Sequence, residues 1–171
     1  MSARLTRLLL AAAFLLVLVA VTVVVRGHER TLGEGRVVLA ELAPVDPRSL
    51  MQGDYMALRF AIDELLAARA GGAEPERLPR YAWLSLDSEG RASLAELADG
   101  LPPADDQRVA VRIRGRGGQP SIGPNAFFFQ EGTADRYEAA RWGEFRVSRD
   151  GRALLTHLRG AELERLGEIE R

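Results

Sequence analysis

One uninterrupted apolar stretch near the N-terminus sets the environment in which the rest of the chain must fold. Leu8 to Val25 is 18 residues long, and Thr22 is its only polar member. As an α-helix the stretch would be about 27 Å long, close to the thickness of the hydrocarbon core of a bilayer. A surface helix of a globular domain keeps one polar face, which this stretch lacks. The sequence therefore predicts a transmembrane anchor.

The flanking arginines predict the orientation of this anchor. Arg4 and Arg7 precede the apolar stretch, and Arg26 follows it. Because a short basic N-terminus stays in the cytoplasm, we expect a single-pass protein of the cytoplasmic (inner) membrane with its C-terminal part outside the cytoplasm. A cleaved signal peptide is the alternative, but its apolar region usually spans only about 7–15 residues. The best cleavage position, after Ala20, also has the bulky Leu18 where a small residue is needed.

The residues after the anchor are expected to form one small domain. About 145 residues remain, a length that suits a single hydrophobic core. We therefore expect a cytoplasmic N-terminus, the anchor, a polar juxtamembrane linker, one globular domain and an acidic C-terminal helix or tail, over residues 1–7, 8–25, 26–35, 36–160 and 161–171.

Alternating apolar and polar side chains predict that this domain is rich in β-strands. Between residues 55 and 62, one face would carry Met56, Leu58, Phe60 and Ile62, which indicates a half-buried strand. Further strands are expected at 36–42, 81–86, 92–97, 108–115, 125–130, 145–148 and 153–158, with hairpins at Asp87–Gly90 and Asp150–Gly151.

Short helices are expected between these strands. Asp63 would cap a helix ending at Ala70, Thr133 would cap one ending at Trp142, and a third would cover residues 161–170. The pattern lacks the regular helix–strand alternation of parallel sheets. The predicted fold class is therefore α+β: a transmembrane helix followed by a mostly antiparallel, barrel-like or sandwich-like domain with two or three short helices.

The composition excludes several kinds of chemistry. The chain has no Cys and no Lys, so all 23 basic residues are Arg. Thiolate chemistry, a Schiff-base lysine and a P-loop lysine are thereby excluded. His28 and His157 are the only imidazoles, which disfavours a histidine-built zinc site. After Arg26 there are 20 arginines against 24 acids, so nucleic acid is not an expected partner. We expect no metal and no other cofactor.

Two segments, in this order, resemble a bacterial protein family. The first has the sequence GDYMALRF, and the second contains FFQEG followed by Tyr137 and ARWGE, at residues 53–60, 128–132 and 140–144. Together they are similar to the family named for its GDYXXLXY motif, and the resemblance runs from the anchor to about Leu158. It implies a membrane helix followed by a small domain of uncharacterised function. Genes of this family often lie beside genes for polytopic membrane proteins, which implies such proteins as partners.

Two positions depart from the family pattern. Phe60 stands where the name motif has Tyr, so no role of this position can require a hydroxyl group. Trp142 stands where Tyr is frequent, which indicates a slot for aromatic packing.

The polar and aromatic residues of these segments make up the candidate functional surface. Asp54 precedes a strand, where an aspartate commonly accepts backbone hydrogen bonds in a turn. Glu131 precedes an expected helix, whose dipole favours an acid. With Glu144, these acids could instead form a cluster for ligand binding or hydrolysis, although no motif fixes the separation of their carboxyl groups. The full set is Arg48, Gly53, Asp54, Tyr55, Gln130, Glu131, Tyr137, Arg141 and Glu144.

Three functions remain open at this point. We favour a non-catalytic subunit or binding module that associates with polytopic membrane proteins. The first alternative is a ligand-binding or hydrolytic domain that uses the acids and Arg141. The second is an envelope-structural module that contacts anionic lipid through arginines at alternate positions, namely Arg108, Arg112, Arg114 and Arg116. The run Phe127–Phe129 is expected to lie partly in the core, and a middle ring facing outward would mark an interaction patch.

Overall fold

The computed structural model describes residues 3–43, 51–52, 55–70, 79–102, 105–116 and 119–167. It divides into two compact units, residues 1–34 and residues 35–171. The first unit is one helix, and the second is a domain of antiparallel sheets.

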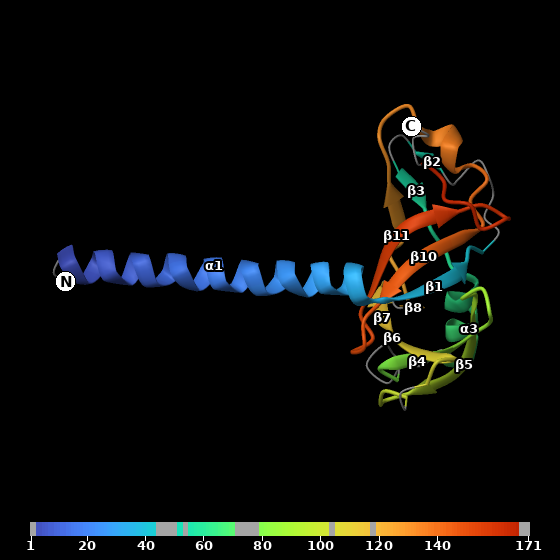
Figure 1. The fold of residues 1–171 in the computed structure, drawn as a ribbon, viewed down its shortest axis with the longest axis horizontal. Helices are drawn as coiled ribbons and strands as arrows, with labels where there is room; N and C mark the ends of the chain where they lie inside the picture. The colour runs from blue at the N-terminus through green and yellow to red at the C-terminus, as the bar shows by residue number, and fades with distance from the viewer. Residues whose placement is uncertain are drawn as a thin grey trace. The chain divides into compact units, whose positions relative to one another are not determined.

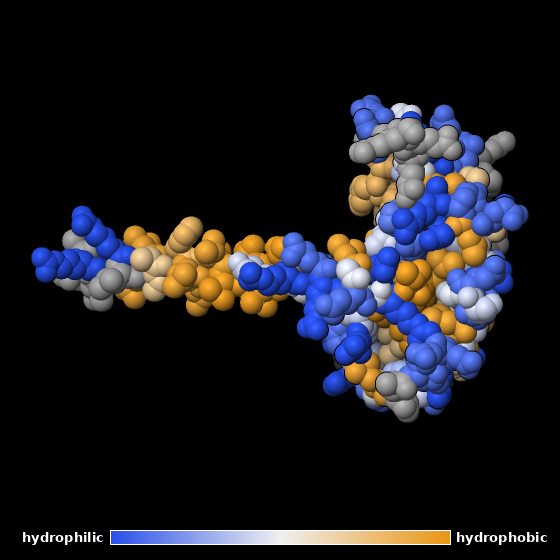
Figure 2. Space-filling model, in the orientation of Figure 1, coloured by the Kyte–Doolittle hydropathy of each residue, from blue (hydrophilic) through white to orange (hydrophobic). Residues whose placement is uncertain are grey.

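The first unit, α1 (Ala3–Glu34), is one continuous helix. Its middle part presents apolar side chains on the surface shown in Figure 2, and hydrophilic side chains lie toward both ends. By length and composition α1 is suited to cross a membrane, a property that N-terminal signal sequences share. The hydroxyl of Thr22 donates to the carbonyl of Leu18 at 2.8 Å, so this polar group is satisfied inside the helix.

The polar segment that was expected to be a linker is helical as far as Glu34. Hydrogen bonds of i,i+4 spacing support this extension, because Thr31 donates to the carbonyl of Gly27 at 2.9 Å and Arg30 pairs with Glu34 at 2.9 Å.

In the described residues, the second unit contains four small antiparallel sheets, and all of their strands except β9 are labelled in Figure 1. The first has the order β1–β10–β11 (Arg36–Glu41, Trp142–Val147 and Ala153–Arg159). The second has the order β5–β4–β6 (Ala92–Ala98, Tyr81–Leu86 and Arg108–Arg112). The third has the order β2–β3–β9 (Met51–Gln52, Tyr55–Ala57 and Ala126–Phe128). The fourth pairs β7 with β8 (Arg114–Arg116 and Gln119–Ser121). The antiparallel sheets together with α-helix confirm the predicted α+β class. The sheets are open, so the described part of the domain does not form a closed barrel.

Hairpin turns join the two larger sheets. In the turn between β4 and β5, the Asp87 carboxylate accepts the backbone N–H groups of Glu89 and Arg91, both at 2.9 Å. The N–H of Leu39 in β1 donates to the carbonyl of Gly90 at 2.8 Å. At the turn between β10 and β11, the carbonyl of Gly151 accepts the N–H of Arg112 in β6, also at 2.8 Å. Both hairpins were predicted from the sequence, and each one ties its own sheet to the other.

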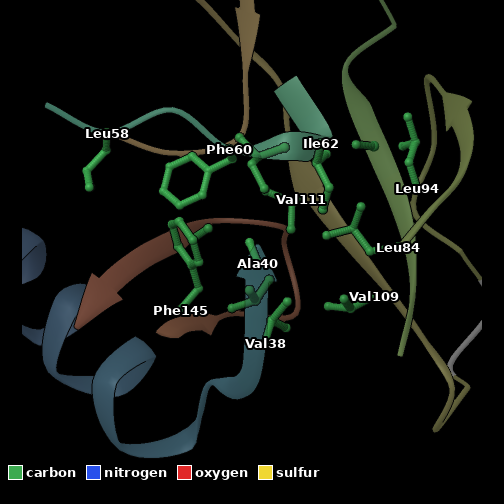
Figure 3. Close-up of a cluster of buried hydrophobic side chains, with 14 of the residues drawn as sticks. Val38, Ala40, Leu58, Phe60, Ile62, Leu84, Leu94, Val109, Val111 and Phe145 are labelled. Atoms are coloured by element: carbon green, nitrogen blue, oxygen red, sulfur yellow. The ribbon is translucent and has the colours of Figure 1, made fainter. Parts of the chain in front are cut away.

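The core lies between these sheets and the helix α3 (Ala61–Ala70), which lies against β1, β5 and β8 (Figures 1 and 3). Phe60 and Phe145 are 0% and 1% exposed, and their rings meet edge to face with centroids 5.2 Å apart. The alternation prediction is confirmed for burial, since Met56, Leu58, Phe60 and Ile62 are all in the core. It is wrong for conformation beyond Ala57, because Phe60 pairs with Leu42 in an isolated bridge and Ile62 already belongs to α3.

The predicted helix caps are wrong. Asp63 lies inside α3, and its carboxylate accepts the hydroxyl of Ser121 at 2.8 Å and the N–H of Ile122 at 2.9 Å, which fastens the loop after β8. Burial raises the pKa of Asp63, and these hydrogen bonds only partly oppose that effect. The hydroxyl of Thr133 donates to the carbonyl of Gln130 and makes no cap hydrogen bond.

Two of the expected helices are also absent from the described residues. A short 3₁₀-helix, η2 (Ala134–Tyr137), replaces the first, because Trp142 already begins β10. Residues 161–167 form turns with a bridge between Arg159 and Arg165. Tertiary contacts of the polar side chains, described below, override the favourable helix propensity of the Ala, Glu, Leu and Arg residues in this segment.

Gly123 provides a test of the core. A Cβ atom at Gly123 would lie 2.6 Å from the ring of Phe60 and 2.8 Å from that of Phe145. We expect Gly123→Ala to lower the free energy of unfolding of the full-length protein by about 1–3 kcal/mol, because a packed core responds poorly to extra volume. Urea unfolding in mild detergent, followed by tryptophan fluorescence, measures the change. Gly100→Ala is the matched control, since nothing lies within 4 Å of a Cβ there. Equal stabilities of the two variants would contradict the packing described here.

Candidate functional site

Three of the nine candidate residues, Arg48, Gly53 and Asp54, lie outside the described residues. The other six are placed, and they fall into two groups that were not separable in the sequence. One group lies on exposed surface, and the other helps to hold the fold.

The aromatic run at residues 127–129, which spans the end of β9, divides between surface and core. Phe128 is 76% exposed, and its ring lies 5.9 Å from that of Tyr55 in the neighbouring strand β3, with which it is paired in register. The middle ring of the run therefore faces outward, the arrangement that was expected to mark an interaction patch. Gln130 and Glu131 follow at exposed positions. We name Tyr55 and Phe128 the aromatic patch.

Tyr137 belongs to the packed group. Its ring contacts Phe127 edge to face and stacks with Phe129, with centroid distances of 5.3 and 5.2 Å. A Cβ atom at Gly167 would lie 2.2 Å from the Tyr137 hydroxyl oxygen, so the backbone near the C-terminus passes directly beside this side chain. Tyr137 thus connects the aromatic run at residues 127–129 with the C-terminal segment around Gly167.

Glu144 is fully buried and is surrounded by cations. Its Oε2 atom accepts Nε of Arg159 at 2.7 Å and Nε of Arg165 at 3.2 Å. Its Oε1 atom accepts Nη2 of Arg165 at 3.0 Å. Nδ1 of His157 lies 3.8 Å from Oε1, which is beyond hydrogen-bond distance. We name these four residues the Glu144 cluster.

Glu144 and the core residue Phe145 are neighbours in β10 and are both buried, and a β-bulge lies beside them in β11. Successive residues of a regular strand point to opposite faces. The register between β10 and β11 shifts after Glu144, which pairs with His157 while Phe145 pairs with Leu155. The extra residue, Thr156, donates its hydroxyl to the carbonyl of Glu144 at 3.1 Å. Because this extra residue belongs to β11, Glu144 and Phe145 still alternate along β10, and their burial shows that both faces of β10 are covered at this point.

The arginines keep the Glu144 carboxyl ionised. Burial alone would raise the pKa of Glu144, but the hydrogen bonds from Arg165 and Arg159 outweigh burial and hold that pKa below its ordinary value of 4.5. A carboxylate that is enclosed in this way is a poor proton donor near neutral pH. Its two guanidinium partners link β11 and the C-terminal segment to β10.

Arg141 is exposed and does not join this cluster through any described contact of its side chain. Its backbone carbonyl accepts the N–H of Leu42, and its own N–H donates to the carbonyl of Arg159, both at 2.8 Å. Glu131 is not among the described partners of Glu144 either. Within the part of the chain that the structure describes, no three His, Asp or Glu side chains gather as metal ligands.

The arginines at alternate positions are partly neutralised. Arg108 pairs with Asp105 at 3.0 Å and lies over the ring of Trp83, 6.0 Å from its centroid. Arg112 pairs with Asp150 at 3.3 Å. Arg114 donates to the carbonyl of Ala153 at 3.2 Å. The described part of this stripe therefore has acidic or carbonyl partners of its own.

Sequence reasoning missed Arg159 and Arg165 as partners of Glu144. They lie 15 and 21 residues further along the chain, and no local spacing rule relates residues at such separations. The available signal was an acid directly before the strand expected at 145–148, in a chain rich in arginine, since a buried carboxylate requires a cationic or hydrogen-bonding partner.

Substituting Glu144 tests the structural role of its cluster. Glu144→Gln leaves two guanidinium groups without their anion, so we expect the free energy of unfolding to fall by about 3 kcal/mol, near the lower end for buried ion pairs. The lower end applies because both arginines keep partial contact with solvent. Urea unfolding of the full-length protein in mild detergent gives the value. The control, Glu131→Gln at an exposed position, is expected to change it by less than about 0.5 kcal/mol. A similar, small effect of both substitutions would contradict the structural role.

The pH dependence of stability gives an independent test. Because the pKa of Glu144 is lowered in the folded protein, its contribution is fully present above the ordinary value of 4.5 and is lost as the pH falls through the lower folded-state pKa. The pKa of Asp63 is raised, so its effect on the pH dependence of stability has the opposite sign. This effect is present in both wild type and variant and therefore cancels in their difference. The stability difference between wild type and Glu144→Gln should therefore shrink below about pH 4.5. A difference that stays constant down to acid unfolding would refute the assignment.

The comparisons with known proteins agree with the motif segments. The profile of the GDYXXLXY protein family matches residues 17–158, which include the GDYMALRF, FFQEG and ARWGE segments. No curated protein and no solved structure matches the chain. The match covers most of the chain, and the chain therefore belongs to the GDYXXLXY family.

Proposed function

We propose that this protein is a non-catalytic, membrane-anchored binding module whose aromatic patch contacts an extramembrane part of a polytopic membrane protein. The observation that carries the proposal is that Phe128 is 76% exposed. Its ring lies beside that of Tyr55, which belongs to the motif that names the family. Large aromatic side chains commonly serve as anchors of protein interfaces, since they bury much area with little loss of side-chain entropy.

The different environments of the motif residues support this proposal, since some are packed inside the domain and Phe128 is exposed. Glu144 and Tyr137 are engaged with other parts of the domain, in the Glu144 cluster and in stacking with Phe129. Phe128 contributes little to the packing of the domain, because most of its side chain is in contact with solvent. Contact between an apolar ring and water is unfavourable, so a partner that covers the ring of Phe128 would gain free energy from removing it from water.

The anchor supports the choice of partner. We place α1 in the cytoplasmic membrane with its N-terminus in the cytoplasm and the domain in the periplasm, following the arginines that precede the apolar stretch. A domain held at the membrane surface has a high local concentration relative to other membrane proteins, so a modest contact area suffices for association. The association with polytopic proteins that the family implies is consistent with such tethering.

The alternative functions receive less support. Hydrolysis needs an acid and a base with access to substrate, whereas Glu144 is buried and held ionised by two arginines. Lipid binding through the arginine stripe needs cations that are available to phosphates, whereas Arg108 and Arg112 already face Asp105 and Asp150.

Site-specific photocrosslinking tests the proposal. The chain has no Lys, so amine-reactive crosslinkers can reach only an N-terminal amine, and a benzophenone amino acid is better placed at position 128. In native membranes we expect Phe128→benzoylphenylalanine to yield one dominant adduct with a polytopic protein. The matched control places the same group at Leu101, another exposed apolar residue. In a competition arm, Phe128→Ala should reduce co-purification of that protein by about tenfold or more.

The outcomes of this experiment are distinct. An adduct specific to position 128 supports the aromatic patch as the interface. Equal, diffuse adducts at positions 128 and 101, together with unchanged co-purification of Phe128→Ala, would reject it. Unfolding of Phe128→Ala in urea provides the folding control, and it is expected to match wild type within about 0.5 kcal/mol because the ring is exposed.

A further inference from the structure

The segment Gly160–Gly167, which we name the C-terminal clasp, folds back on β11 at the end of the domain. The N–H of Gly160 donates to the carbonyl of Glu164, and that of Leu163 donates to the carbonyl of Gly160, at 3.0 and 3.2 Å. The N–H of Leu166 reaches the carbonyl of Leu158 in β11 at 2.9 Å. These bonds close a compact loop whose last residues return to the sheet that carries Glu144.

The clasp is attached chiefly by polar contacts. Of its residues, Leu166 packs against the hydrophobic core as a partly buried side chain. Leu163 has a φ of 63°, a left-handed conformation that is strained for a leucine. Its carbonyl accepts Nη1 of Arg159. A short segment with little apolar burial and a strained residue can open without unfolding the rest of a domain.

Arg165 supplies the contact that matters most for the carboxylate. Arg159 reaches Oε2 of Glu144 from β11 through Nε and Nη2, at 2.7 and 2.6 Å. Arg165 bridges both oxygens of the carboxylate, with Nη2 at 3.0 Å from Oε1 and Nε at 3.2 Å from Oε2. If the clasp opened, Oε1 would lose this charged donor while Arg159 continued to hold Oε2.

The geometry of the contact selects a guanidinium group. Nε and one terminal nitrogen of a planar guanidinium can meet the two oxygens of a carboxylate together, which a single ammonium cannot do. The carboxylate is 0% exposed, so water does not compete with this pairing while the clasp is closed. Whatever replaces Arg165 must therefore bring two parallel N–H donors and a positive charge.

We propose that the Glu144 carboxylate is a binding site for a guanidinium group, filled within the chain by Arg165, and that an arginine side chain of the membrane partner takes this position when the clasp opens. The second half of this inference rests on the proposed function. Glu144 lies inside the family match and Arg165 lies beyond its last residue, Leu158, so the carboxylate belongs to the matched region and its bridging cation does not. In the free protein, Arg165 of the clasp occupies the site and keeps it closed.

Chemical rescue of Arg165→Ala tests the site without any partner. In full-length protein in mild detergent, hydrogen–deuterium exchange should show the amides of Gly160, Leu163 and Leu166 exchanging about tenfold faster or more in the variant than in wild type. Amides inside β10 should change by less than about twofold. Ethylguanidinium at millimolar concentration should restore protection in a saturable way, whereas ethylammonium at the same ionic strength should not. The control, Arg152→Ala, removes an exposed arginine that pairs with Asp150 and should leave the clasp amides unchanged.

The outcomes separate this inference from the proposed function. Unchanged exchange in Arg165→Ala, or equal rescue by both cations, overturns the guanidinium site even if the aromatic patch crosslinks as expected. Failure of the crosslinking with selective rescue leaves the site in place and removes its partner. If Arg165→Ala does not fold, Arg165→Lys keeps the positive charge at this position but lacks the planar pair of N–H donors. The clasp amides of Arg165→Lys should therefore exchange about tenfold faster than those of wild type, and exchange equal to wild type would overturn the proposal.

Discussion

The contact between Phe60 and Phe145 is the point on which the domain depends. Phe60 lies where the GDYMALRF segment leads into α3, and Phe145 lies in the middle of β10. Their rings leave no room for side chains at Gly123 and Gly143, where a Cβ atom would come within 2.6 and 2.9 Å of Phe60. The contact therefore brings three distant parts of the chain to one place. It also explains why a phenylalanine is suitable at position 60, since a fully buried hydroxyl would need a hydrogen-bond partner.

Beside this apolar contact the same strand carries a buried charge. Glu144 is enclosed next to Phe145 in β10, and the arginines that neutralise it fasten the C-terminal clasp to the sheet. Breaking one member of a buried ion cluster is costly, but a well-packed apolar substitute can be as stable. Glu144 is therefore better understood as a specific attachment point than as a source of stability alone.

The aromatic run of β9 relates the two proposals to each other. Phe127 and Phe129 contact the ring of Tyr137, which lies beside the clasp, while Phe128 faces solvent next to Tyr55. A partner that covers Phe128 would thus bind to a strand whose flanking rings contact the residue against which the clasp rests. This connection gives a physical route by which docking at the aromatic patch could loosen the clasp, since packed aromatic groups shift together.

Local patterns in the sequence determined the N-terminal apolar helix, both hairpins and the buried face of residues 56–62, because periodicity and turn chemistry act over a few residues. They also determined the α+β class and, through the order of three motif segments, the family. The tertiary structure alone decided which motif residues face solvent, since the three phenylalanines at 127–129 are chemically identical and only packing distinguishes Phe128. It decided that Asp63 fastens a loop and that residues 161–167 form turns, because their partners lie far along the chain. The role of Glu144 was likewise invisible, since its arginines approach only when β11 and the clasp fold back upon β10.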